Sequence, residues 1–318
     1  MIFSVENLCC GYQGHAVLSD ISFSAMDGAV LCILGPNGVG KTTLFRTLMG
    51  LLPCLDGDIR VDGRSTLKWG ARQRARVMGF VPQSHVPPFP YTVKQVVVMG
   101  RASHLRMFSA PDEQDYALAD DILRSLGIEN LEDRVYTRIS GGERQMALIA
   151  RALIQSPRIL LMDEPAANLD LANQIMVLET VRKLAARGII VIMTTHTPDH
   201  AFLCGTEALL LTRDKEMIHG EPEQVITAEN MRRVYGVDVC STTARKKWET
   251  DPWLRACHGQ PHEFVNTAIS GDEIKKEERV KKNEKHEKIH HTVPDPCALP
   301  DFAGRLRIIL LGGDFLRG

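Results

Sequence analysis

Short, continuous apolar runs recur along the chain between its start and about position 240. They lack the strict alternation of a half-exposed strand, which is typical of strands buried on both faces of a sheet. Three runs are predicted to be such strands: 29–34, 158–163 and 188–194. A helical pattern follows each of them, over 41–50, 170–186 and 199–203. Strands that alternate with helices predict an α/β fold with a largely parallel sheet.

Residues 84–156 follow a different pattern, because they contain no strand-like run. Helical periodicity covers 92–99, 111–126 and 141–154. The sequence Val-Pro-Pro-Phe-Pro at 86–90 precedes these helices, and its prolines would break any element that runs in from the core. We therefore expect a helical subdomain, at about 84–156, inserted into the α/β core.

The pattern changes again after residue 244. Between 272 and 291 most side chains are charged, with the two signs nearly balanced, which is typical of a solvated helix or a disordered linker. We expect one domain over 1–244 and a charged extension over 245–318. The extension holds a loose set of histidines and cysteines: Cys257, His258, His262, His286, His290, His291 and Cys297. Their spacing matches no tight zinc-binding pattern, so incidental histidines and a metal site both stay open as interpretations.

Composition narrows the class of protein. The chain has 318 residues, enough for about two domains. Its 38 Lys and Arg against 39 Asp and Glu give a net charge of −1, which argues against a nucleic-acid partner. No apolar run approaches the ~18 residues of a membrane span, and residues 1–6 lack the pattern of a secretion signal. Eight scattered cysteines suit buried thiols in a reducing compartment.

A glycine-rich motif lies between the first predicted strand and its helix. The sequence Gly-Pro-Asn-Gly-Val-Gly-Lys-Thr at 35–42 matches the phosphate-binding loop G-x-x-x-x-G-K-[ST]. Glycines let backbone N–H groups turn inward around phosphate oxygens, and the following helix directs its positive dipole end at them. Lys41 supplies charge for the β and γ phosphates, and the Thr42 hydroxyl can ligate Mg²⁺. The nucleotide-binding residues predicted here are Gly35, Pro36, Asn37, Gly38, Val39, Gly40, Lys41, Thr42 and Thr43.

Two carboxylates follow the second predicted strand. Asp163 and Glu164 come at the end of the apolar run Ile-Leu-Leu-Met. Asp163 would hold Mg²⁺, directly or through water, and Glu164 would act as general base on an attacking water. The alternative is a pair of carboxylates that cap the next element. Beside a phosphate loop, the pair is sufficient for nucleotide hydrolysis, because phosphoryl transfer needs mainly positioning and charge neutralisation.

The sequence Ser-Gly-Gly-Glu-Arg-Gln at 140–145 comes shortly before the strand that leads to Asp163, and it resembles the signature motif of ABC-type ATPases. The resemblance covers residues 1 to about 240 and implies a P-loop ATPase core with an antiparallel β edge. Tyr12 looks like the aromatic residue that stacks on adenine. Gln83 looks like the glutamine that senses Mg²⁺ and the transmembrane partner, and His196 looks like the switch histidine.

The resemblance also implies a second copy of the chain. In this family Ser140, Gly141 and Gly142 open a helix that completes the γ-phosphate site of the opposing subunit. The signature begins with Ile139 rather than the usual Leu and has Glu143 where Gln is common. Neither change removes the serine or the two glycines, so we expect an active ATPase.

The roles implied for the other motif residues follow the same family. Residues 168–170 look like the D-loop. The catalytic residues would be Glu164, His196 and Lys41. The cofactors would be ATP and Mg²⁺, with the metal held by Thr42, Gln83 and Asp163.

The kind of ABC ATPase is indicated by what the chain lacks and by a few further residues. Without a membrane span, any pore must be a separate permease, as in prokaryotic importers. Residues 91–93, 98–101 and 194–196 resemble the importer branch for ferric siderophores, haem and cobalamin, and equally that for molybdate and tungstate. We expect a peripheral protein on the cytoplasmic face of the membrane, served indirectly by a substrate-binding protein. The alternatives are an exporter subunit and a non-transport ABC ATPase in DNA repair or on the ribosome, although the stretch between Gln83 and Ser140 is too short for a long coiled coil.

Overall fold

The computed structural model describes residues 1–85, 87, 89–105, 109–236, 239–242 and 307–310. Internal contacts divide the chain into one unit of residues 1–242 and 307–318 and a second unit of 243–306. The second unit lies outside the described residues, as do the charged run at 272–291 and all seven histidines and cysteines of the predicted extension. Among the described residues, no helix combines the length and apolar character needed to cross a bilayer.

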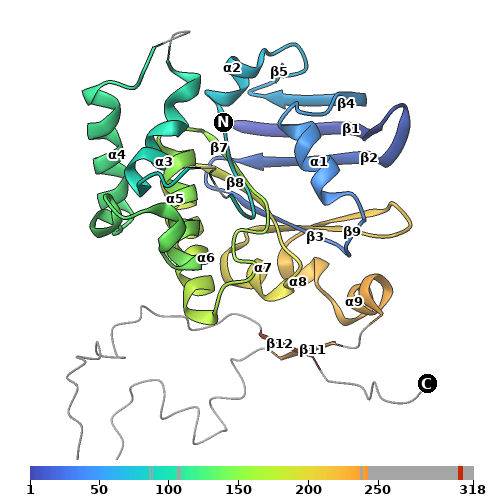
Figure 1. Ribbon diagram of the computed structural model, residues 1–318. Helices are drawn as coiled ribbons and strands as arrows, with labels where there is room; N and C mark the ends of the chain where they lie inside the picture. The colour runs from blue at the N-terminus through green and yellow to red at the C-terminus, as the bar shows by residue number, and fades with distance from the viewer. Residues whose placement is uncertain (86, 88, 106–108, 237–238, 243–306, 311–318) are drawn as a thin grey trace, which may run out of the picture. The chain divides into compact units, whose positions relative to one another are not determined.

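A six-stranded sheet forms the centre of the first unit (Figure 1). Five of its strands are parallel neighbours, and the sixth is an antiparallel edge. In spatial order they are β10 (Met217–Gly220), β9 (Glu207–Leu211), β3 (Val30–Leu34), β8 (Ile190–Thr194), β7 (Ile159–Met162) and β6 (Met78–Val81). Every residue of β3, β7 and β8 is buried, which is why these three lack alternation in sequence. The predicted parallel sheet is confirmed.

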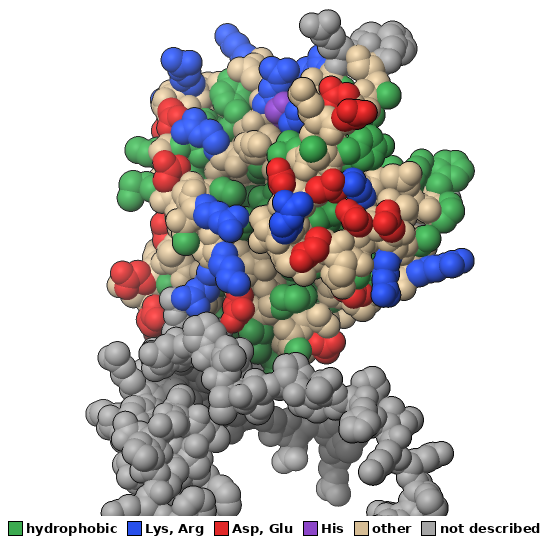
Figure 2. Space-filling view, turned by 90° about the vertical axis from the view of Figure 1, so that its left-hand side faces the viewer, with side chains coloured by type: hydrophobic (Ala, Val, Ile, Leu, Met, Phe, Trp, Pro, Cys, Tyr) green, Lys and Arg blue, Asp and Glu red, His purple; other side chains and the backbone are tan. Residues whose placement is uncertain are grey.

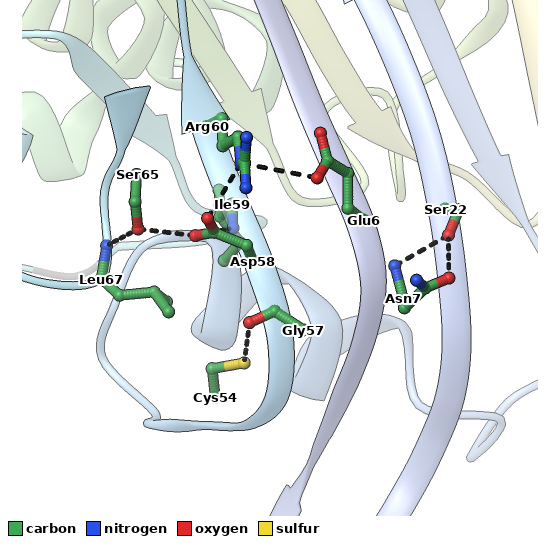
Figure 3. A network of polar contacts seen from close by, with 10 residues as sticks. All are labelled: Glu6, Asn7, Ser22, Cys54, Gly57, Asp58, Ile59, Arg60, Ser65 and Leu67. Atoms are coloured by element: carbon green, nitrogen blue, oxygen red, sulfur yellow. Dashed lines mark hydrogen bonds and ion pairs between the residues drawn. The ribbon is translucent and has the colours of Figure 1, made fainter. Parts of the chain in front are cut away.

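A second sheet is antiparallel, as the family resemblance implied. Its strands lie in the order β2 (His15–Met26), β1 (Ile2–Tyr12), β4 (Cys54–Val61) and β5 (Arg64–Ser65). One face carries polar contacts (Figure 3): Asp58 accepts from Ser65 at 2.6 Å and from Arg60 at 2.9 Å, which ties β4 to β5. The opposite face is apolar and contributes Phe3, Leu8 and Ile21 to the main core.

Helices fill the space around these sheets. Helix α1 (Lys41–Leu48) adds Leu44, Phe45 and Leu48 to the same core as the antiparallel sheet and β3. The other helices of the core are α2 (Ala71–Ala75), α6 (Leu171–Ala186), α7 (Pro198–Cys204), α8 (Pro222–Val225) and α9 (Ala228–Tyr235). Strand β11 (Val239–Thr242) pairs antiparallel with β12 (Arg307–Leu310).

Between β6 and β7 the described chain is helical. The elements are α3 (Val93–Val98), η1 (Met99–Ser103), α4 (Glu113–Ser125), η2 (Glu129–Leu131), η3 (Tyr136–Arg138) and α5 (Gly141–Leu153), where η marks a 3-10 helix. They lie together on one side of the sheets in Figure 1. Helices α3, α4 and α5 each begin with a capping box, formed by Thr92 with Gln95, Asp112 with Asp115 and Ser140 with Glu143. These caps fix the three helix starts close to the predicted positions.

Candidate functional site

The phosphate loop connects β3 to α1, with Gly35 directly after the strand and Gly40 as the N-cap of the helix. Gly35 has a φ of +152° and Gly40 a φ of +116°, a backbone region that favours glycine. A Cβ at Gly35 would lie 2.8 Å from the Leu211 carbonyl oxygen, so space as well as conformation requires glycine there. The loop is thus a tight backbone turn that opens onto a helix N-terminus, the geometry that binds phosphate.

Lys41 lies at the centre of this loop. Its side chain is buried, and Nζ donates to the Gly35 carbonyl at 2.6 Å and to the Pro36 carbonyl at 3.2 Å. Burial lowers the pKa of Lys41, and the charges of Glu164 and Asp163 oppose this effect. The predicted cation and the two predicted carboxylates therefore act on one another across the loop.

Tyr12 ends β1 beside α1. Its side chain is 43% exposed. A hydrogen bond with Thr43 is the main cause that lowers the pKa of the Tyr12 hydroxyl, and Arg46 adds to it. The Tyr12 hydroxyl therefore lies close to the first turns of α1, and the residue remains half-exposed. Thr42 is exposed and Thr43 is buried in the same turn.

The two carboxylates are held in place by Thr194, the last residue of β8. Its Oγ1 donates to Asp163 Oδ1 at 2.7 Å and accepts from the Glu164 N–H at 2.9 Å. Thr194 is fully buried, so this hydroxyl has no contact with solvent. No role for Thr194 was predicted from the sequence. The signal was available, because a polar side chain at the end of an otherwise apolar buried strand needs a partner.

Two further predicted residues lie next to the Glu164 carboxylate. Gln83 Nε2 donates to Glu164 Oε2 at 3.2 Å, and His196 Nδ1 lies 3.4 Å from the same oxygen. These side chains follow the carboxyl ends of β6, β7 and β8, which are neighbours in the sheet. Glu164 has a φ of +45°, so its backbone is in the left-handed region.

The signature segment lies at the start of α5. The Ser140 N–H donates to Glu143 Oε2 at 2.7 Å, and Ser140 Oγ accepts from the Glu143 N–H at 3.3 Å. Because Oγ acts as an acceptor in this box, its own proton is available to an external partner. Gly142 packs on α6, where a Cβ would lie 2.1 Å from Asn173 Oδ1. Asn173 is bound to Asp170, the N-cap of α6, so the signature and D-loop segments form one structural unit.

The predicted residues therefore fall into two groups. Gln83, Asp163, Glu164 and His196 lie together near Lys41. Within the described part of the chain, no hydrogen bond or ion pair joins Ser140, Gly141 or Gly142 to that group.

Three comparisons show what this chain is similar to. The ABC transporter family model matches residues 18–167. An ABC transporter ATP-binding protein of Haemophilus influenzae is 38% identical over 74% of this chain and 89% of its own length. The molybdate import ATP-binding protein MolC of the same organism is 35% identical over 77% of this chain and 92% of its own. A solved structure, an inward-facing conformation of a putative metal-chelate type ABC transporter, has a TM-score of 0.69 at 35% identity and covers 76% of this chain and 92% of that one.

The chain belongs to the ATP-binding proteins of ABC transporters. Members of this family bind nucleotide and hydrolyse ATP to drive transport. They dimerise and work with transmembrane permease subunits, so association with a membrane follows from the family.

Proposed function

We propose that this protein is the ATP-hydrolysing subunit of a prokaryotic importer. It powers uptake of a metal chelate (ferric siderophore, haem or cobalamin) or of molybdate or tungstate through a separate permease. The observation that carries hydrolysis is the Glu164 carboxylate, in contact with Gln83 and near His196 beside the phosphate loop. The substrate classes are supported by the molybdate relative and by the metal-chelate type structure.

ATP binds along the phosphate loop in this proposal. The N–H groups of residues 35–43 surround the phosphates, and Lys41 neutralises charge on the β and γ phosphates. The half-exposed ring of Tyr12 stacks on the adenine. Burial of Lys41 strengthens its attraction for phosphate, because the local dielectric is lower than that of water.

The residues next to the loop fit Mg²⁺, which prefers hard oxygen ligands. Asp163 Oδ1 is fixed by Thr194, and within the described residues its Oδ2 accepts no hydrogen bond. Asp163, the exposed Thr42 hydroxyl and the Gln83 amide oxygen would hold the metal. Mg²⁺ would supply charge neutralisation at the β and γ phosphates.

Glu164 acts as the general base. Its carboxylate takes a proton from the attacking water, and the Gln83 amide fixes the carboxylate by its hydrogen bond to Oε2. His196 lies 3.4 Å from the same oxygen and its side chain is half-exposed, so its ring can reach the γ phosphate and the water. Lys41, Glu164 and His196 are thus the catalytic residues.

The site is completed by a second copy of the chain. The Ser140 hydroxyl and the N–H groups of Gly141 and Gly142 bind the γ phosphate held by the opposing subunit. The helices of residues 84–156 dock the permease on the cytoplasmic face of the membrane, and a substrate-binding protein delivers the cargo outside. Residues 1–244 form the ATPase domain, and no role is assigned to 245–318.

Glu164→Gln tests the hydrolytic proposal. ATP binding should persist, while kcat falls by about 100-fold or more, because general-base catalysis contributes at least that much. The variant should also elute as a dimer with ATP on gel filtration. Glu113→Gln, an exposed carboxylate on α4, is the matched control and should keep the parent rate. Hydrolysis at the parent rate by the Glu164 variant would remove Glu164 from the mechanism.

Reconstitution with its own permease and binding protein tests the cargo. ATP hydrolysis should rise in the presence of a ferric chelate, haem, a corrinoid, or molybdate or tungstate, and the responding ligand identifies the class. Export of a substrate, or no response to any of these ligands, would contradict the importer proposal.

A further inference from the structure

The chain between Asp62 and Asp112 contains no acidic residue. Residues 63–111 include eight cations: Arg64, Lys68, Arg72, Arg74, Arg76, Lys94, Arg101 and Arg106. The whole chain is nearly neutral, so this stretch concentrates positive charge in one part of the molecule. The stretch runs from β5 through α2 and β6 to α3 and η1.

Some of these cations have partners within the protein. Lys94 pairs with Asp120 at 2.6 Å, and Arg101 pairs with Asp115 at 2.7 Å. Arg74 donates to the Thr66 carbonyl at 2.9 Å, and its guanidinium packs over Gly50, where an added Cβ would collide with it. These three side chains therefore stabilise the fold.

Four others do not have an acidic partner. Arg64, Lys68, Arg72 and Arg76 are exposed, and none of them forms an ion pair with a described residue. We call this set the α2 cationic surface, since it lies on and beside that helix. Figure 2 shows Lys and Arg side chains gathered around a histidine near the top of the face it displays.

One hydrogen bond joins the α2 cationic surface to η1, and a charge effect reaches His104, the residue that follows η1. Arg72 Nε donates to the Ser103 carbonyl at 3.0 Å. Burial lowers the pKa of His104, and the charges of Arg101 and then Arg76 lower it further. The cations of α2 therefore share one surface with η1, although they come from separate segments.

Apolar groups accompany these charges. Leu67 is 46% exposed directly before Lys68, and Trp69 is half-buried directly after it. Cations interspersed with leucine and tryptophan are typical of segments that bind the interface of an anionic membrane.

We propose that the α2 cationic surface binds the anionic phospholipid headgroups of the membrane that holds the permease. This rests on the proposed function for one point, the presence of that membrane beside η1 and α3. An acidic loop of the permease is the other possible partner. Cytoplasmic loops of membrane proteins carry an excess of Lys and Arg, so the main anionic groups at that surface are lipid headgroups.

Vesicle sedimentation of the full chain tests the proposal. Vesicles of phosphatidylcholine with phosphatidylglycerol should bind the protein, and vesicles of phosphatidylcholine alone should not. Replacing Arg64, Lys68, Arg72 and Arg76 together by Gln should lower the partition coefficient by about 100-fold or more, since each cation near an anionic surface contributes about fivefold. The matched control replaces four exposed cations elsewhere, Arg182, Lys183, Arg187 and Arg213, by Gln and should bind as the parent does.

The salt dependence of vesicle binding and the rate of ATP hydrolysis in solution complete the test. Binding by the parent protein should disappear at about 1 M salt, where charges are screened beyond roughly 3 Å. Equal binding to both kinds of vesicle, or equal loss in the two quadruple variants, would overturn the proposal. ATP hydrolysis in solution should be unchanged in both variants, so failure to bind vesicles is distinguishable from failure of the ATPase assignment.

Measurements on the assembled transporter distinguish a contact with lipid from a contact with the permease. The parent should hydrolyse ATP faster in nanodiscs that contain phosphatidylglycerol than in neutral nanodiscs. The quadruple variant of the α2 cationic surface should lose this stimulation. A defect of the same size in neutral and anionic nanodiscs would place the contact on the permease instead and overturn the lipid proposal.

Discussion

At the scale of single residues, the site depends on one buried hydroxyl. Thr194 binds the Asp163 carboxylate and the Glu164 backbone at once, so it links the metal-binding and water-activating groups proposed here. A buried hydroxyl that satisfies two partners contributes more than either bond alone, because its loss leaves both partners unsatisfied. The sequence predicted the two carboxylates because they follow an apolar strand. It could not predict that Thr194 binds them, because spacing along the chain does not show which strands are neighbours in the sheet.

Thr194→Val tests this role. The change keeps the shape of the side chain and should lower the free energy of unfolding by about 1–3 kcal/mol, since a partly buried carboxylate oxygen and a partly buried N–H lose their partner. It should also reduce kcat more than ATP affinity. The measurements are denaturant unfolding and steady-state hydrolysis. Thr180→Val is the control, because this buried hydroxyl donates to the Met176 carbonyl of its own helix, and its one other polar contact among the described residues is with Met146 Sδ of α5, at 3.8 Å. An equal loss of kcat there would contradict a specific role for Thr194.

His200 gives the protein a predictable pH dependence. The side chain is buried in α7, and burial, with a contribution from the charge of His196, lowers its pKa from 6.5 to about 4. The unfolded chain takes up a proton below about pH 6.5, and the folded chain does not until about pH 4. Stability should therefore fall by about 3 kcal/mol from this group as the pH drops from 6.5 to 4.

His200→Asn isolates this effect, because Asn does not titrate and keeps a polar partner for the Thr195 hydroxyl, which lies 2.8 Å from His200 Nδ1. Unfolding measured at several pH values should show a shallower acid loss in the variant. Parallel curves for variant and parent would contradict a depressed pKa at His200.

At the scale of elements, the signature helix and the helix of the D-loop are fitted to each other. Gly142 of α5 lies against Asn173 of α6, and Asn173 is itself held by Asp170. Both helix starts were predictable, since Ser140 and Asp170 are good N-caps before helical patterns. Their mutual packing was not, because it depends on how the two helices cross.

Gly142→Ala should therefore be destabilising in spite of the better helix propensity of alanine. The new Cβ would lie 2.1 Å from Asn173 Oδ1 and 3.0 Å from its Cβ, so backbone as well as side chain must move. We expect a loss of about 1–3 kcal/mol in unfolding free energy, as for other overpacked sites. Gly141→Ala, which meets only Leu169 Cδ2 at 3.4 Å, should be nearly neutral, and equal losses in the two would contradict the packing argument.

Strands were predicted unevenly. The buried runs of β3, β7 and β8 are continuous and apolar, so the sequence identifies them directly. Strand β1 is 11 residues long but mixes buried and exposed positions, and its pairing shifts register at three places with β2. Such irregular strands carry a weak periodic signal, and the antiparallel sheet was expected only from the family resemblance.

At the scale of the whole molecule, the groups proposed here to bind and hydrolyse ATP come from residues 1–242. The described hydrogen bonds of Lys41, Gln83, Asp163, Glu164 and Ser140 all have partners inside that range. The composition of the chain excluded a strongly basic protein but could not show where its cations gather. That distribution depends on which positive side chains meet a carboxylate in the fold, as Lys94 and Arg101 do.

A chain of residues 1–242 should keep ATP hydrolysis within about twofold of the full chain. The truncation leaves β11 without its partner β12, but it removes none of the residues proposed to bind or hydrolyse ATP. Hydrolysis and thermal unfolding of the two forms are the measurements. A folded but inactive truncation would show that 243–318 contribute to catalysis.

The left-handed backbone of Glu164 also decides which variants can be compared. Its φ of +45° costs a residue such as Glu or Gln about 1–3 kcal/mol, because the Cβ crowds the backbone in this region. Glu164→Gln retains this cost, so its phenotype reports the loss of the carboxylate alone. Glu164→Gly would release the strain and let the Asp163–Glu164 turn relax. Glu164→Gly would therefore change the backbone as well as remove the carboxylate, so it is unsuitable as a comparison. A replacement with an amide or alkyl side chain removes the carboxylate and keeps the backbone angle.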